Sequence, residues 1–232
     1  MAHSLPRNPM ILDVHTHTLP PQPGTAIVSI RSSEWAVQQG AWTPQPGHWY
    51  AVGLHPWDIV GDGEEQLRLL RSLLLSDTSG QIQMVGETGL DKRRGPSMEI
   101  QRAVFVEQLK TAHSIGKIPV VHDVRCMAEI LAIRRELHYT EPWLIHGFRG
   151  GPEQAQQYLR AGCHVSLGVH FRSDTLLSLP PNELFLESDE HPEKLQALYD
   201  DVSQLLNMPV QAIKQQVNDN VLHLLRNESC FL

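Results

Sequence analysis

The sequence predicts an α/β fold, namely a (β/α)8 barrel of the TIM type that is incomplete because helices are missing after the first strands. Eight short apolar runs, most of them rich in Val, Ile and Leu as buried parallel strands are, are mostly followed by amphipathic stretches. The 232 residues contain no internal repeat, low-complexity segment or linker, which predicts one domain over residues 1–232. Periodicity alone is also compatible with a doubly wound open sheet.

The strands are predicted where apolar runs are short. These runs cover residues 10–14, 25–30, 49–54, 83–85, 118–121, 143–145, 164–167 and 184–186. Helices are predicted where apolar residues recur at three- and four-residue spacing. These stretches cover residues 64–75, 98–115, 128–137, 152–159, 192–206 and 210–225. Pro152 and Pro209 stand where two of the helices begin, a position that tolerates the missing backbone N–H.

The wall of the barrel is thin at the first two connections. Residues 18–24 hold Pro20, Pro21 and Pro23, so we expect no helix there. An extended segment of this length spans roughly 25 Å, enough to run back along a strand. The second connection, residues 31–48, has room for about two helical turns around residues 33–39. A loop, a terminal helix or a partner chain must cover the apolar surface, and the sequence leaves monomer and homo-oligomer open.

Composition excludes several classes of protein. A net charge of −7 gives no general basic field for nucleic acid, so a phosphate-bearing substrate must be held locally. The three cysteines are far apart and odd in number, which argues against a disulfide framework and favours a reducing compartment. We find no signal peptide and no apolar stretch long enough to span a membrane. A cytoplasmic protein without membrane contact is therefore expected.

Metal-competent side chains stand at the carboxyl ends of the predicted strands. His15 and His17 close the first strand, and residues i and i+2 of a strand face the same side. Others follow the fourth, fifth, sixth and eighth strands, and the C-terminal ends of all barrel strands meet at one mouth. Mixed imidazole and carboxylate ligation suits zinc, manganese or another divalent ion. The residues expected to meet there are His15, His17, Glu87, His122, His146 and Asp189.

With these motifs in place, the chain resembles the TatD family of metal-dependent hydrolases, which belongs to the amidohydrolase-like barrels. The resemblance covers nearly the whole chain, through DVHTH, VGLHPWD, VGETGLD, PVVHD, IHGFRG and LESDEHP, in that order. The chain differs from typical members in its short segment between the first two strands. It also differs in HDVRC, where Arg125 stands one place later than the common wording has it.

The resemblance implies a site for two divalent metal ions, with zinc, magnesium and manganese as candidates. His15, His17 and Asp189 would hold one ion, His122 and His146 would hold the second, and Glu87 would bridge them. Two cations about 3.5–4 Å apart can lower the pKa of a bridging water and neutralise charge on a phosphoryl oxygen. Asp189 is the expected general base, and Glu87 and Asp189 are the expected catalytic residues.

Four further residues are candidate substrate contacts. The resemblance places His55 of VGLHPWD at the mouth, where a hydrogen-bonded loop histidine is the alternative. Arg125 and Arg149 follow the fifth- and sixth-strand histidines, respectively, and could clamp a phosphate, or they could be solvated surface residues. Lys92 begins the only compact basic run, which could steer phosphate or form an ordinary solvated loop. Asp91, at the end of the GETGLD motif, could orient a ligand or a strand-end backbone.

The predicted function is a metal-dependent phosphodiesterase of the deoxyribonuclease kind, because members of the resembled family hydrolyse phosphodiesters. A small phosphoester or the end of a single DNA strand suits the acidic chain better than a long duplex. Two alternatives stay open. One is a metal-dependent hydrolase of a small phosphoester, amide or ester, because this fold serves several chemistries. The other is a non-enzymatic scaffold, which the complete ligand set makes the weaker hypothesis.

Overall fold

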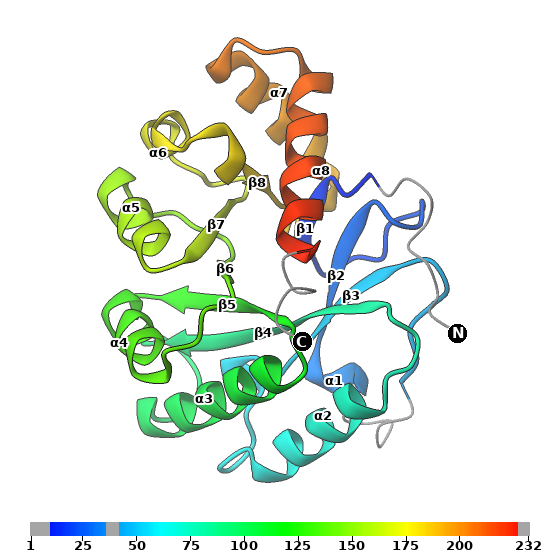
Figure 1. Ribbon diagram of the computed structural model, residues 1–232, viewed down its shortest axis with the longest axis vertical. Coiled ribbons are helices and arrows are strands. Elements are labelled where there is room, and N and C mark those ends of the chain that lie inside the picture. Colours follow the sequence, from blue (N-terminus) through cyan, green and yellow to red (C-terminus); the bar gives the residue numbers. More distant parts are fainter. Residues whose placement is uncertain (1–9, 36–41, 227–232) are drawn as a thin grey trace.

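The computed structural model describes residues 10–35 and 42–226 and forms a nearly closed barrel of eight parallel strands (Figure 1). The strands are β1 (Asp13–Thr16), β2 (Ala26–Ile30), β3 (Trp49–Val52), β4 (Ile82–Asp91), β5 (Ile118–Val124), β6 (Trp143–Ile145), β7 (Cys163–Leu167) and β8 (Phe185–Leu186). Each pairs with the next in sequence, and a parallel bridge from Thr16 to Asp189 joins the two edges. This closure confirms the barrel and excludes the open doubly wound sheet.

Helices surround the strands on the outside (Figure 1). They are α1 (Ser32–Trp35), α2 (Glu64–Ser76), α3 (Met98–Ser114), α4 (Met127–Leu137), α5 (Pro152–Arg160), α6 (Ser173–Ser178), α7 (Leu195–Leu206) and α8 (Val210–Arg226), with short 3-10 turns η1 (Pro56–Asp58), η2 (Pro181–Glu183) and η3 (Pro192–Lys194). The six predicted helices form within a few residues of their expected bounds. Helix α6 was not predicted, because its six residues are too few to show a helical period.

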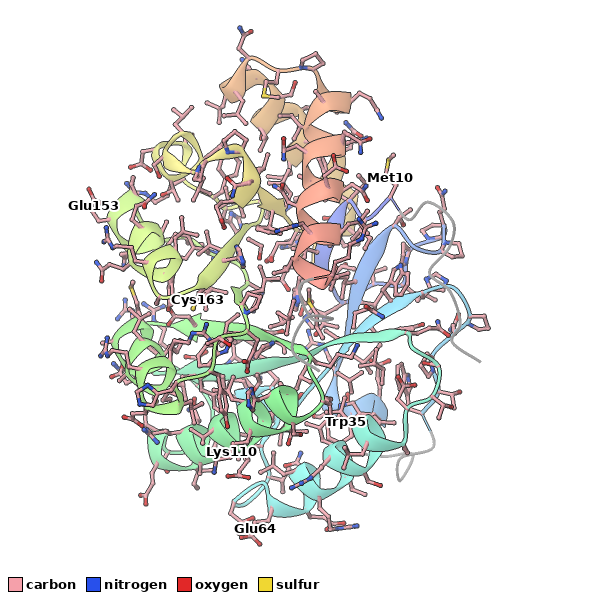
Figure 2. All side chains as sticks on the ribbon, in the orientation of Figure 1. Met10, Trp35, Glu64, Lys110, Glu153 and Cys163 are labelled. Carbon is pink, nitrogen blue, oxygen red and sulfur yellow. The ribbon has the colours of Figure 1, made fainter. Side chains whose placement is uncertain are left out.

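Burial explains why the strands read as continuous apolar runs. Every residue of β1, β2, β3, β4, β6 and β8 is buried, as expected for parallel strands that are covered on both faces. Figure 2 shows Glu64 and Glu153 at the outer edge of the molecule, on α2 and α5, whereas Cys163 on β7 lies inside. Polar helix faces therefore meet solvent while the strands form the core.

The described residues of the first two connections, β1–β2 and β2–β3, contain little helix. No helix joins β1 to β2, as predicted, and in the second connection α1 covers the described residues from Ser32 to Trp35. Residues 36–39 of the helix expected there lie outside the described residues. The Trp35 side chain is fully buried and donates from Nε1 to the Gly53 carbonyl at 3.1 Å. It packs in one apolar cluster with Tyr50 and Leu70, so a single large side chain closes much of the barrel wall here. In the described part of the chain, every helix falls short of what crossing a bilayer requires.

Candidate metal centre

Glu87 lies at the middle of the cluster, and a bulge in β4 places it there. The β4–β5 register passes from Val85 opposite Pro119 to Thr88 opposite Val121, so β4 carries one extra residue at this point. The sequence analysis ended this strand before Glu87, whereas β4 continues to Asp91 and holds Glu87 inside the strand. Gly86 permits the close approach of β5, because a Cβ on Gly86 would lie 2.6 Å from the Val120 carbonyl oxygen.

One carboxylate oxygen of Glu87 faces the end of β1. Glu87 Oε2 lies 3.5 Å from His15 Nε2 and 3.4 Å from His17 Nε2. Asp189 Oδ1 lies 3.8 Å and 3.6 Å from the same two nitrogens. The backbone sets this geometry, because Asp189 N donates to the His15 carbonyl at 3.0 Å and His17 N donates to the Asp189 carbonyl at 3.1 Å. The bridge between the first and last strands thus forms the first donor set, His15, His17 and Asp189.

The other oxygen of Glu87 faces β5 and β6. Glu87 Oε1 lies 2.7 Å from His122 Nδ1 and 2.6 Å from His146 Nε2. His55 Nε2 also lies 3.1 Å from this oxygen and 3.3 Å from His122 Nδ1. This second donor set, His55, His122 and His146, contains one residue that the sequence analysis considered as a substrate contact. The position of His55 makes it a further candidate ligand.

The first donor set and Glu87 fit a divalent cation by their spacing and their burial. Donors about 2.1 Å from a tetrahedral zinc ion are roughly 3.4 Å from one another. The separations from Glu87 Oε2 to His15 and His17 are 3.5 Å and 3.4 Å, longer than ordinary hydrogen bonds and close to that value. His15 is completely buried, and neither of its ring nitrogens has a hydrogen-bond partner among the described residues. A buried imidazole without partners is costly, and a metal ion would satisfy it.

Further polar groups orient two of the imidazoles. His17 Nδ1 donates to the Ser29 carbonyl at 3.0 Å, which leaves its Nε2 lone pair directed at the cluster. His122 turns Nδ1 inward and places Nε2 3.3 Å from Asp91 Oδ2. Such partners fix the tautomer and the ring orientation of metal-binding histidines. The structure therefore gives Asp91 the orienting position that the sequence analysis considered for it.

Glu187 is the orienting residue that sequence reasoning missed. It is completely buried, its Oε1 lies 3.4 Å from His146 Nδ1, and its Oε2 accepts a hydrogen bond from Ser166 Oγ. The signal was present, because Glu187 stands between β8 and Asp189 in the LESDEHP motif. Periodicity did not show that this carboxylate turns toward β6 rather than toward the mouth.

The electrostatics of the cluster are those of a cation site. Burial alone would raise the pKa of Glu87, but the charge of His146 and hydrogen bonds from the surrounding imidazoles hold it well below its usual range. Burial would lower the pKa of His146, yet Glu87 and Glu187 raise it well above its usual range. Buried carboxylates thus favour positive charge at this position, and metal ions would take the place of the protons.

The predicted substrate-contact residues lie at different distances from this centre. His55 is part of the cluster, while Arg125 and Arg149 line a cavity of about 600 Å³ that also reaches His122, His146 and Asp189. Lys92 is directed elsewhere, because its Nζ pairs with Glu129 Oε1 at 2.5 Å on the outside of the rim. A smaller cavity of about 120 Å³ lies over the cluster on the β2 side and is lined by His17 and Glu190 among others.

Comparison with known proteins places this centre in a family. The profile of the TatD-related DNases matches residues 23–226. His15 and His17 precede the matched region, so their place in the site rests on the fold. An uncharacterised metal-dependent hydrolase from Haemophilus influenzae is 24% identical over 202 residues, which cover 75% of this chain and 76% of the relative.

Solved structures share the fold. A TatD homologue from Escherichia coli K12 superposes with a TM-score of 0.78 at 22% identity, covering 93% of this chain and 98% of the homologue. A TatD family hydrolase from Entamoeba histolytica gives a TM-score of 0.69 at 15% identity, covering 86% of this chain and 83% of that protein. An uncharacterised amidohydrolase from Saccharomyces cerevisiae gives 0.68 at 13% identity, with 86% and 88% covered. These similarities confirm the barrel.

Proposed function

Since this chain belongs to the family of TatD-related DNases, we propose that it is a metal-dependent hydrolase that cleaves phosphodiesters, with DNA ends as its substrate class. The observation that supports this most strongly is the position of Glu87. Each of its two oxygens faces a separate group of imidazoles. A carboxylate shared in this way would serve two metal ions, and paired ions can stabilise both the attacking and the leaving oxygen of a phosphoester.

The six residues expected from the sequence, together with His55, would hold two divalent ions. The first donor set and Glu87 Oε2 would hold one ion, and the second donor set and Glu87 Oε1 would hold the other. Zinc, manganese and magnesium are the candidate ions, and the mixture of imidazoles and carboxylates favours zinc or manganese. When bound, the ions would activate water and neutralise charge on the phosphoryl oxygens.

Asp189 is the residue placed to move the proton. Its side chain is 33% exposed, whereas that of Glu87 is 7% exposed, so Asp189 reaches both the cluster and the cavities around it. Asp189 would accept a proton from the attacking water as the new P–O bond forms. The ester P–O bond to the leaving alcohol then breaks, the alcohol oxygen takes a proton from solvent, and Asp189 releases its proton to solvent.

The proposed substrate is a short or single-stranded DNA end rather than a long duplex. The chain carries a net charge of −7, and phosphate contacts dominate the affinity of proteins for duplex DNA. Arg125 and Arg149 are the proposed contacts to the substrate, whereas Lys92, also expected from the sequence, pairs with Glu129, and His55 lies among the donors. Cys126 and Cys163 are buried and unpaired, which supports a reducing, cytoplasmic environment.

The test is a panel of substrates with defined metals. The chelated and dialysed protein receives Mg²⁺, Mn²⁺ or Zn²⁺ and is assayed on a bis-aryl phosphodiester, a labelled single-stranded oligonucleotide, an aryl phosphomonoester and an aryl ester. We expect metal-dependent cleavage of the two phosphodiesters and loss of that cleavage in Asp189→Asn. Cleavage of the ester or the monoester alone would replace the proposal with the corresponding hydrolase, and no bound metal by elemental analysis would reject both.

A further inference from the structure

The larger cavity beside the metal centre is formed by the loops that follow β5 and β6. It has a volume of about 600 Å³, within the usual range for sites that bind small organic ligands. Its inner end is formed by His122, His146 and Asp189, which belong to the two donor sets. A substrate held over the metal centre can therefore extend into this cavity without a gap.

Two cationic side chains in this cavity are free to bind an anion. Within the described parts of the chain, neither the Arg125 nor the Arg149 guanidinium has an ion-pair partner. Two other cations near the mouth are already engaged, since Arg31 pairs with Glu190 and Lys92 pairs with Glu129. Unpaired arginines that share one cavity are suited to bidentate contacts with phosphate.

Two carboxylates also line this cavity: Asp189 belongs to the first donor set, and Asp123 is engaged by neutral donors instead of the arginines. Asp123 Oδ2 accepts a hydrogen bond from Tyr158 Oη at 2.7 Å, and Asp123 Oδ1 accepts one from Cys126 N at 2.7 Å. Both oxygens are thus occupied by neutral donors that hold the β5–α4 loop. The guanidinium groups remain available, and they lie in the cavity with the apolar side chains of Met127 and Phe148.

Apolar surface and two unpaired arginines in one cavity fit the chemistry of a nucleotide, which has an apolar base and anionic phosphate. The smaller cavity on the β2 side differs, because it has about 120 Å³ and its arginine, Arg31, is bound to Glu190. The two sides of the metal centre are therefore unequal in size and in available positive charge. We propose that the larger cavity binds the nucleoside next to the scissile ester together with its second phosphate, through Arg125 and Arg149.

This inference rests on the proposed phosphodiesterase function and specifies its substrate. The enzyme would prefer a nucleotide with a second phosphate one nucleoside away from the scissile bond over an ester with a single phosphoryl group. The second phosphate could be an internal diester of a DNA strand or a terminal monoester. Both present anionic oxygens to the same guanidinium groups.

The experiment measures directly how much the second phosphate raises kcat/KM. The metal-loaded, full-length protein is assayed on two pairs of substrates. The first pair is the p-nitrophenyl ester of thymidine 5′-phosphate with and without a 3′-phosphate. The second pair is the p-nitrophenyl ester of thymidine 3′-phosphate with and without a 5′-phosphate. Charge-assisted hydrogen bonds at a partly exposed site predict an increase in kcat/KM of about tenfold or more for one regioisomer. The ratio between the paired substrates should fall toward one in Arg125→Gln and Arg149→Gln. It should be kept in Arg160→Gln, which changes an exposed arginine at the far end of α5.

A second measurement does not depend on turnover. Calorimetry should show thymidine 3′,5′-bisphosphate binding to the wild type more tightly than thymidine 5′-phosphate, with the difference lost in the two cavity variants. Capping the second phosphate as a methyl diester identifies its source: retained preference indicates an internal diester, and lost preference indicates a terminal monoester. Equal kcat/KM for paired substrates in both regioisomers, with cleavage intact, overturns this inference alone. If none of these esters is cleaved, the proposed function is rejected. Calorimetry then still decides whether the cavity binds the second phosphate.

Discussion

Replacing Glu87 with Gln tests the centre most directly. The change keeps the shape of the side chain and removes one buried negative charge. Both oxygens are affected, because Oε1 lies within 3.1 Å of the inward nitrogens of His55, His122 and His146, and Oε2 lies within 3.5 Å of those of His15 and His17. An amide cannot accept from both sides, since its nitrogen is a donor. Both donor sets should therefore lose metal affinity together.

The size of the effect follows from burial. Removing one partner of a buried charge interaction costs about 3–5 kcal/mol, which corresponds to a fall in metal affinity of roughly 10²–10⁴-fold. At a metal concentration one hundred times Kd, an ion bound only to the folded protein adds about 2.7 kcal/mol of stability. For a protein of this size, that should raise the Tm by roughly 5–10 °C per ion.

The assay is thermal unfolding of the chelated protein during titration with Zn²⁺ or Mn²⁺, combined with elemental analysis of bound metal. We expect the wild type to gain stability and Glu87→Gln to gain little at the same concentrations. Glu64→Gln is the matched control, because Glu64 is exposed on α2 at the outer edge of the molecule (Figure 2). Wild-type metal content and Tm gain in Glu87→Gln would refute the bridging role of this carboxylate.

Three further substitutions distinguish residues that support metal binding from residues that support only the stability of the fold. Glu187→Gln should lower metal affinity by about 10–100-fold, because Glu187 orients His146, and competition with a fluorescent chelator measures this; unchanged affinity would remove Glu187 from the centre. Trp35→Ala should cost about 3–5 kcal/mol of unfolding free energy, since it leaves a cavity in the thin wall. Urea unfolding checks that value, and a cost below 1 kcal/mol would mean that other residues cover the wall. Tyr158→Phe should cost about 1–2 kcal/mol by leaving Asp123 short of one donor, with metal content unchanged, and a loss of metal would contradict its purely structural role.

Much of the fold could be predicted because the strands and long helices carry strong local patterns. The apolar runs and the three- and four-residue spacing located all eight strands and the six longer helices. The predictions were less complete where local pattern is weak. Helix α6 is too short to show periodicity, β8 has only two residues, and the bulge continues β4 beyond the apolar run to Asp91. The single-domain prediction stays a prediction.

The donor residues could also be predicted, because the carboxyl ends of parallel strands must meet in a barrel. The structure brings all six expected residues into one cluster. It adds Glu187 and the Ser29 carbonyl, which reach the histidines through tertiary contacts that no local spacing encodes. It also brings His55, which was expected at the mouth as a substrate contact, within 3.1 Å of Glu87 Oε1. The roles of these residues as ligands stay predictions until metal is measured.

The sequence by itself determined which donor chemistry is present and at which end of each strand it stands, because side-chain direction alternates along a strand and strand ends are marked by apolar runs. Only the tertiary structure decided how the donors divide into two sets. The β4 bulge turns Glu87 between them, and the bridge from Thr16 to Asp189 joins positions 173 residues apart. Such pairings arise from closure of the barrel, a property of the whole chain that no short segment specifies.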